Sequence, residues 1–66
     1  MSTIKVKGMS CQHCVASVTK ALSAIAGIAD VKVSLEKGEA TFNEKSPVAM
    51  DIIKDAITKI GFEVVD

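Results

Sequence analysis

Two spacings of hydrophobic residues alternate along this chain of 66 residues, and together they predict an alternation of strands and helices. In residues 3–7 every second side chain is hydrophobic, which is typical of a strand with one buried face. Its inward residues are Ile4 and Val6. Farther along, the spacing changes to three or four, as on one face of a helix. The residues on that face are Val15, Val18, Leu22 and Ile25. We expect this helix to end at Gly27, because glycine tolerates the positive φ of a helix terminus.

The middle of the chain returns to the alternation of a strand. Residues 30–36 and residues 39–43 alternate on either side of a glycine-containing turn, which predicts a hairpin. The expected inward side chains are Val31, Val33, Leu35, Ala40 and Phe42.

A second helix is predicted after the hairpin. Ser46 followed by Pro47 indicates its start, because serine caps a helix and proline suits the first helical position. Its expected buried face comprises Ala49, Ile52, Ile53, Ala56 and Ile60. Gly61 should end this helix, and residues 62–65 should form a last strand.

The resulting order of elements is strand, helix, strand, strand, helix, strand. This order predicts an α+β fold of the ferredoxin-like βαββαβ type, a sandwich with a four-stranded antiparallel sheet and two helices on one face. The length allows one domain, which we assign to residues 1–66. Each half ends its helix at a glycine and enters a strand, but the first half alone carries cysteines.

Composition excludes several classes of function. Eight lysines balance eight acidic residues, and arginine and tryptophan are absent, so the chain lacks the basic and aromatic surface of a nucleic-acid binder. The apolar runs are far shorter than the ~20 residues that span a bilayer, so we expect no membrane insertion. The first residues do not resemble a signal peptide, which favours a cytoplasmic protein.

The candidate chemistry is the pair Cys11 and Cys14. In a reducing compartment such a pair indicates metal binding or redox activity rather than a structural disulfide. Cys11 is expected in the loop and Cys14 near the start of the first helix, where the positive end of the helix dipole stabilises thiolates. Two thiolates favour soft ions, copper(I) or mercury(II) foremost, whereas zinc normally takes four ligands. A thioredoxin-type redox pair, or an incidental or dimerising pair, remains open at this point.

Residues 8–14, GMSCQHC, resemble the signature G-M-S/T-C-x-x-C of the heavy-metal-associated domain family. Residues 60–64, IGFEV, are similar to the ending Gly-Tyr/Phe-x-Val of that family. The family comprises copper chaperones, N-terminal domains of copper-transporting P-type ATPases, and mercuric-ion-binding proteins. The resemblance covers the whole chain and is closest to the bacterial copper(I) chaperones. It also implies the βαββαβ fold.

The resemblance assigns the metal ligands to Cys11 and Cys14. Met9 would point into the core and shape the loop, as suits a flexible thioether. His13 would face solvent and tune the thiolates with pH, or have no role; as a direct ligand it is disfavoured, because adjacent residues of a tight loop rarely point at one ion.

Three further residues complete the expected site. Gly8 would serve the backbone geometry of the loop, and Ser10 would help to shape it. Phe62 would act as a hydrophobic lid beside the metal, with plain core packing as the competing interpretation.

The functional hypothesis is a cytosolic copper(I) chaperone that passes its ion to a metal-transporting P-type ATPase, or to another C-x-x-C domain, by thiolate exchange. Alternatives are an excised N-terminal domain of a copper ATPase, a mercuric-ion carrier and, from a different class, a dithiol redox protein. The family resemblance makes zinc(II) and cadmium(II) less favoured cargoes, because family members for those ions often place an acidic residue beside the pair, whereas the neighbours here are Ser10 and Val15. We expect a monomer without metal, a metal-bridged dimer as a loaded form, and no catalysis, since no nucleophile–base set or phosphate loop is present.

Overall fold

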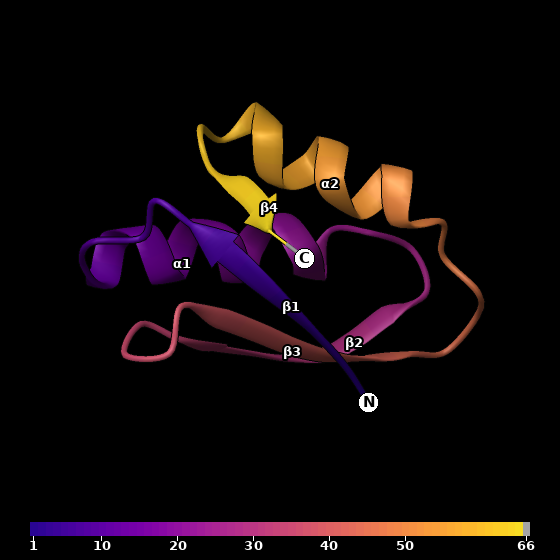
Figure 1. The fold of residues 1–66 in the computed structure, drawn as a ribbon. Coiled ribbons are helices and arrows are strands. Elements are labelled where there is room, and N and C mark those ends of the chain that lie inside the picture. The colour runs from indigo at the N-terminus through magenta and orange to yellow at the C-terminus, as the bar shows by residue number, and fades with distance from the viewer. Residues whose placement is uncertain (66) are drawn as a thin grey trace.

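The predicted order of elements is confirmed. The computed structural model describes residues 1–65 and contains six elements in the order strand, helix, strand, strand, helix, strand (Figure 1). They are β1 (Ser2–Lys7), α1 (Gln12–Ser23), β2 (Ile28–Ser34), β3 (Glu39–Glu44), α2 (Met50–Lys59) and β4 (Glu63–Val65).

The four strands form one antiparallel sheet in the order β2-β3-β1-β4. β1 therefore lies inside the sheet, paired with β3 on one side and with β4 on the other. The two helices contact each other and share one hydrophobic core with the strands, so they cover the same face of the sheet. This is the ferredoxin-like sandwich expected from the element order.

Seven of the nine buried core residues were predicted to face inward, and the two others are Ile28 and Ile57. The core consists of nine buried side chains drawn from the first three strands and both helices, and Phe42 is the largest. The nine are Ile4, Val6, Val18, Leu22, Ile28, Ala40, Phe42, Ile53 and Ile57. Burying a side chain of this size stabilises the fold by about 1.5–3 kcal/mol relative to leaving it exposed. The core therefore fixes how β1 and α1 meet, which positions the loop between them.

The first helix is shorter than predicted. It ends at Ser23 rather than at Gly27, and Gly27 lies in the turn that precedes β2, with φ at +92°. The backbone carbonyl of Gly27 accepts a hydrogen bond from the Lys45 amide at 2.6 Å. Gly27 is therefore held by a distant segment, which the local helix pattern could not reveal.

The second strand lies two residues earlier than predicted, because the hairpin turn is longer. The Gly38 amide bonds the Leu35 carbonyl at 3.3 Å, so Leu35 belongs to the turn rather than to the strand. At the other end, a bulge between Ala29 and Lys32 places Asp30 at a φ of +54°. A bulge adds a residue to one strand and so shifts its alternation.

The second helix differs most from expectation. It begins at Met50 after the N-cap Ala49, so Ser46 and Pro47 do not open it. Ser46 instead packs on the turn at Gly27, where its hydroxyl would block any added side chain. Because this contact belongs to another part of the chain, the capping pattern was misleading.

The buried face of α2 is also rotated relative to the prediction. Ile53 and Ile57 are buried, whereas Ile52 and Ile60 are 53% and 37% exposed. The helix carries more apolar side chains than the core can take, and its contacts with α1 and β4 select which of them are buried.

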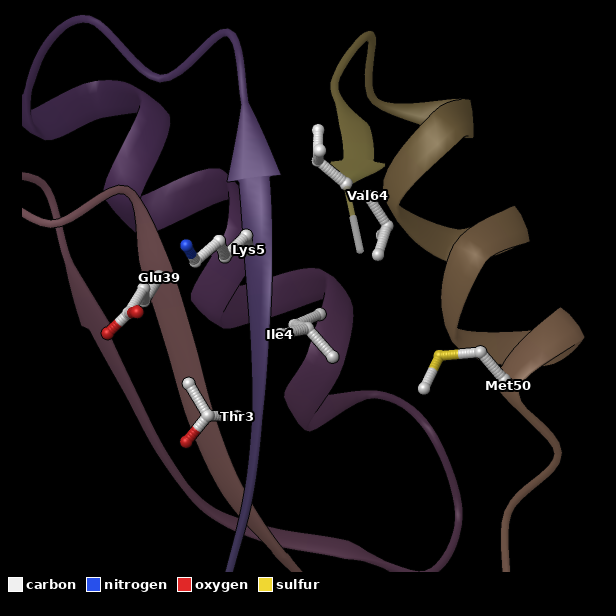
Figure 2. A pocket seen from close by; sticks show the side chains of 7 residues that line it. Thr3, Ile4, Lys5, Glu39, Met50 and Val64 are labelled. Carbon is white, nitrogen blue, oxygen red and sulfur yellow. The ribbon is translucent and has the colours of Figure 1, made fainter.

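The sheet leaves a hollow beside its short last strand. Among residues 1–65, β4 pairs only with residues 5–7 of β1, so none of the described strand residues lies beside the first half of β1 on that side. A hollow of 230 Å³ opens there toward Met50 of α2 (Figure 2). It is lined by Thr3, Ile4, Lys5, Glu39, Met50, Val64 and Val65, and so it lies apart from the cysteine loop. Within residues 1–65, no helix is both long enough and apolar enough to span a bilayer.

Candidate metal centre

The cysteine pair lies at the N-terminus of α1, after a three-residue loop that leaves the end of β1. Cys11 is the N-cap residue, with an extended backbone at φ −158° and ψ 174°. Its carbonyl accepts hydrogen bonds from the amides of Cys14 at 3.0 Å and Val15 at 3.3 Å. The helix therefore starts at Gln12, so Cys14 lies within its first turn rather than at its first residue.

This local fold brings the two sulfur atoms together. Residues three apart on a helical turn share one face, and the Sγ atoms of Cys11 and Cys14 lie 3.6 Å apart. Both cysteines are free thiols; Cys11 is exposed and Cys14 is half-buried. A single soft ion placed between them can reach both sulfurs from the solvent side.

The electrostatics of the helix end favour thiolates. The side chain of Cys11 makes no capping hydrogen bond, and no acidic residue lies in the first turn of α1. The positive end of the helix dipole is therefore left for the sulfurs. Hydrogen bonding from the Ser10 backbone, with further hydrogen bonds from Cys11 and the Ser10 hydroxyl, lowers the pKa of the Cys14 thiol, and burial opposes this only in part. The Ser10 Oγ lies 3.9 Å from the Cys14 Sγ.

The residues around the pair occupy distinct environments. Met9 is half-buried and packs against the hydrophobic core, which is the position that the family resemblance implies. His13 is exposed on α1. Among residues 1–65, no group of three or more His, Cys, Asp or Glu side chains could hold a metal ion.

Gly8 and Phe62 meet at the edge of the loop. Gly8 adopts a φ of +107°, and a Cβ atom built on it would lie 3.2 Å from Cδ1 of Phe62. The sequence pattern named both residues but did not pair them. The pairing of β1 with β4 would have predicted their contact. Lys7 and Glu63 are partners in the sheet, and Gly8 and Phe62 are the next residues beyond that pair.

A site with two soft sulfur donors that is open to solvent can bind a soft cation and expose it to other molecules. Thiolate sulfur binds soft cations such as copper(I) in preference to hard ones. With two protein ligands and one side open to solvent, such an ion can accept a further thiolate from another molecule.

Comparison with known proteins places this geometry in a family. The sequence model of the heavy-metal-associated domain matches residues 3–63. The chain is 41% identical over 63 residues to the copper chaperone CopZ of Staphylococcus aureus, covering 94% of this chain and 93% of that protein.

Solved structures agree with the sequence comparison. The structure of a CopZ metallochaperone superposes with a TM-score of 0.87 at 40% identity, covering 97% of both chains. A copper binding domain from HMA7, a P-type ATPase, superposes with a TM-score of 0.83 at 30% identity, covering 97% of this chain and 90% of that one. On the match over residues 3–63 and this agreement, the chain belongs to the heavy-metal-associated domain family.

Proposed function

We propose that this protein is a copper(I) chaperone whose cargo is held between the thiolates of Cys11 and Cys14. The observation that carries the proposal is the pair of free thiols 3.6 Å apart at the uncapped N-terminus of α1. The relatives named as copper chaperones support copper(I) over mercury(II), zinc(II) and cadmium(II) as the ion. The protein acts in the cytoplasm, where thiols are kept reduced.

The mechanism is an exchange of sulfur ligands. A thiolate of the partner approaches the exposed side of the ion and forms a third Cu–S bond. One Cu–S bond to this protein then breaks, a second partner thiolate binds, and the remaining bond breaks last. The copper stays copper(I) throughout, and each departing thiolate keeps its electron pair. Binding by only two ligands makes this exchange fast, because the incoming sulfur can bind the ion before either Cu–S bond to this protein breaks.

The partner is a second C-x-x-C domain, most simply one that belongs to a metal-transporting P-type ATPase. The likeness to the copper binding domain of HMA7 supports this, because two domains of one fold can present their cysteine loops to each other. That likeness also favours a second candidate function, in which this chain is itself such a domain of an ATPase. In either case the chain is one domain, is monomeric without metal and forms a metal-bridged dimer at high loading.

Side chains near the pair serve binding indirectly. Ser10 supports the Cys14 thiolate, and Met9 anchors the loop in the core. His13 is exposed on α1 beside the pair. Lys20 is exposed and available to an acidic partner, whereas Lys59 already pairs with Asp55 at 3.2 Å.

The direct test is a titration of the reduced protein with copper(I) against a coloured chelator such as bicinchoninate. We expect saturation at about one ion per chain. The double variant Cys11→Ser, Cys14→Ser should lose competitive binding and keep its far-ultraviolet circular dichroism. Tight binding by the folded double variant would refute the site.

Transfer is tested separately from binding. The copper-loaded protein is mixed with an apo C-x-x-C domain that carries a distinguishable tag, and the two are separated and assayed for copper. A chaperone should equilibrate its copper within the mixing time even in excess chelator. If copper reaches the acceptor no faster than it reaches the free chelator, the protein is a store and not a carrier.

A further inference from the structure

The sheet brings Gly8 and Phe62 opposite each other at the end where the cysteine loop begins. The pairs Val6–Val64 and Lys7–Glu63 close the ladder between β1 and β4. One step farther out, the next two positions are Gly8 and Phe62. Side chains that lie directly opposite on neighbouring strands contact each other, but glycine has none to offer.

The aromatic ring of Phe62 lies against the place that a side chain of Gly8 would take. A Cβ on Gly8 would lie 3.2 Å from Cδ1 and 3.9 Å from Cε1 of the ring, so the ring covers the α-carbon closely. An aromatic side chain that covers a glycine on the opposite strand restores packing that the glycine lacks. The φ of +107° at Gly8 keeps other residues out of this position in any case.

Phe62 is itself held firmly. Its amide donates to the Ile57 carbonyl at 3.2 Å in the turn that ends α2, and its half-buried ring packs against the hydrophobic core. Gly8 lies three residues before Cys11, the N-cap of α1. The ring therefore connects the C-terminal end of α2 to Gly8, the first residue of the loop that leads to Cys11. The surface beside it is open, with a hollow lined by Lys7, Gly8, Thr58, Gly61, Phe62 and Glu63.

We propose that Phe62 is a positioning residue for copper(I): by packing on the backbone of Gly8 it holds the loop so that Cys11 meets Cys14. This inference rests on the proposed function and goes beyond a lid over the metal, because the ring acts through Gly8. A loop held in its binding geometry loses less conformational entropy when the ion arrives, which raises affinity.

The first experiment separates positioning from general stability. Phe62→Ala is compared with Val64→Ala, which removes a half-buried core contact two residues farther along, in β4, without touching Gly8. Both variants should unfold at lower urea concentration than the wild type. Phe62→Ala alone should weaken copper(I) binding against bicinchoninate, by about tenfold, the equivalent of 1.4 kcal/mol. Phe62→Tyr, which keeps the ring, should restore most of the affinity.

The second experiment tests the contact itself. Gly8→Ala is measured in the wild-type background and in the Phe62→Ala background. With the ring present, the added methyl group meets both the ring and the strained φ; without the ring it meets the strain alone. The loss of copper(I) affinity should therefore be smaller in the second background. Amide exchange at residues 8–11 should be faster in Phe62→Ala than in Val64→Ala.

The outcomes are distinct. If the wild type does not bind copper(I) through its cysteines, the proposed function fails. If the wild type binds but Phe62→Ala and Val64→Ala lose the same affinity, or if Gly8→Ala costs the same in both backgrounds, Phe62 is core packing and the positioning role is refuted. If either Gly8 variant does not fold, the comparison of Phe62→Ala with Val64→Ala still decides.

Discussion

The two helices of this protein begin in opposite ways. α1 starts after Cys11, with no acidic residue in its first turn, whereas α2 starts after Ala49 and carries Asp51 in its first turn. Neither N-cap side chain makes a capping hydrogen bond. At α2 a carboxylate meets the positive end of the helix dipole. At α1 that end is left to the two cysteine sulfurs, so the proposed metal site lies at the helix end that has no acidic side chain in its first turn.

The middles of the two helices are alike. Each buries two side chains in the shared core, Val18 and Leu22 from α1 and Ile53 and Ile57 from α2. The fold therefore requires the same packing from both halves and requires nothing of the N-terminus of α1. The proposed metal site therefore lies at a helix end whose side chains are not part of the buried core.

The largest effect is expected from a change in the buried face of α2, which tests whether packing in the core is as described. Ile57→Ala should lower the free energy of unfolding by about 2–5 kcal/mol, because it leaves a cavity in the core. Ile52→Ala, on the exposed side of the same helix, should change it by less than about 0.5 kcal/mol. Urea unfolding measures both, and Ile57→Val serves if the first variant does not fold. Equal losses at both positions would mean that the buried face of α2 is misassigned.

A smaller effect should follow from exchanging the electrostatics of the two helix ends. Gln12→Glu places a carboxylate in the first turn of α1. It should stabilise the metal-free protein by about 0.3–1 kcal/mol through the dipole and raise the pKa of Cys14 toward its ordinary value by repulsion.

The matched control is Asp51→Asn at α2. It should lower the stability of the folded protein by a similar amount and leave the titration of the Cys14 thiol unchanged. Urea unfolding and the ultraviolet absorbance of the thiolate report the two quantities independently. A Gln12→Glu protein whose Cys14 titrates as in the wild type would show that the dipole at α1 does not act on the sulfur.

The smallest effect concerns pH. Because the pKa of Cys14 is lowered in the folded protein, the thiolate contributes stability that is fully present above the unfolded-state value near 9.0 and is lost as pH falls through the lower folded-state pKa. Between these two pKa values the reduced, metal-free protein should therefore become more stable as pH rises. Cys14→Ser should remove this part of the pH dependence.

Ser10→Ala should shift the same transition only slightly toward higher pH. It removes the hydroxyl, which is the smallest of the causes, and keeps the backbone of Ser10, which is the largest. Thiolate absorbance against pH measures the shift. A large shift would mean that the hydroxyl, 3.9 Å from the sulfur, matters more than the backbone.

Local patterns were enough for the order of elements and the greater part of the core. The alternation around Ile4 and Val6 and the helical spacing of Val18 and Leu22 were read correctly because burial imposes the period of each element directly on the sequence. The assignment of Cys11 and Cys14 as metal ligands came from the motif and is still a prediction, although the structure brings their sulfurs together.

Contacts between distant segments decided what the patterns could not. Ser46 and Pro47 have the composition of a helix start, yet Ser46 packs on Gly27 and the helix begins later. Ile52 and Ile57 are equally hydrophobic, and packing against the rest of the fold determines that only Ile57 is buried.

The chain by itself therefore determined the kind and order of its elements, and the two cysteines that we propose as metal ligands. The tertiary structure alone decided which face of α2 is buried, and that Phe62 lies on Gly8 beside the cysteine loop. The physical reason is the distance along the sequence between the residues that interact. Hydrophobic period and ligand type belong to residues that are neighbours in sequence, whereas these contacts join segments that only the assembled sheet brings together.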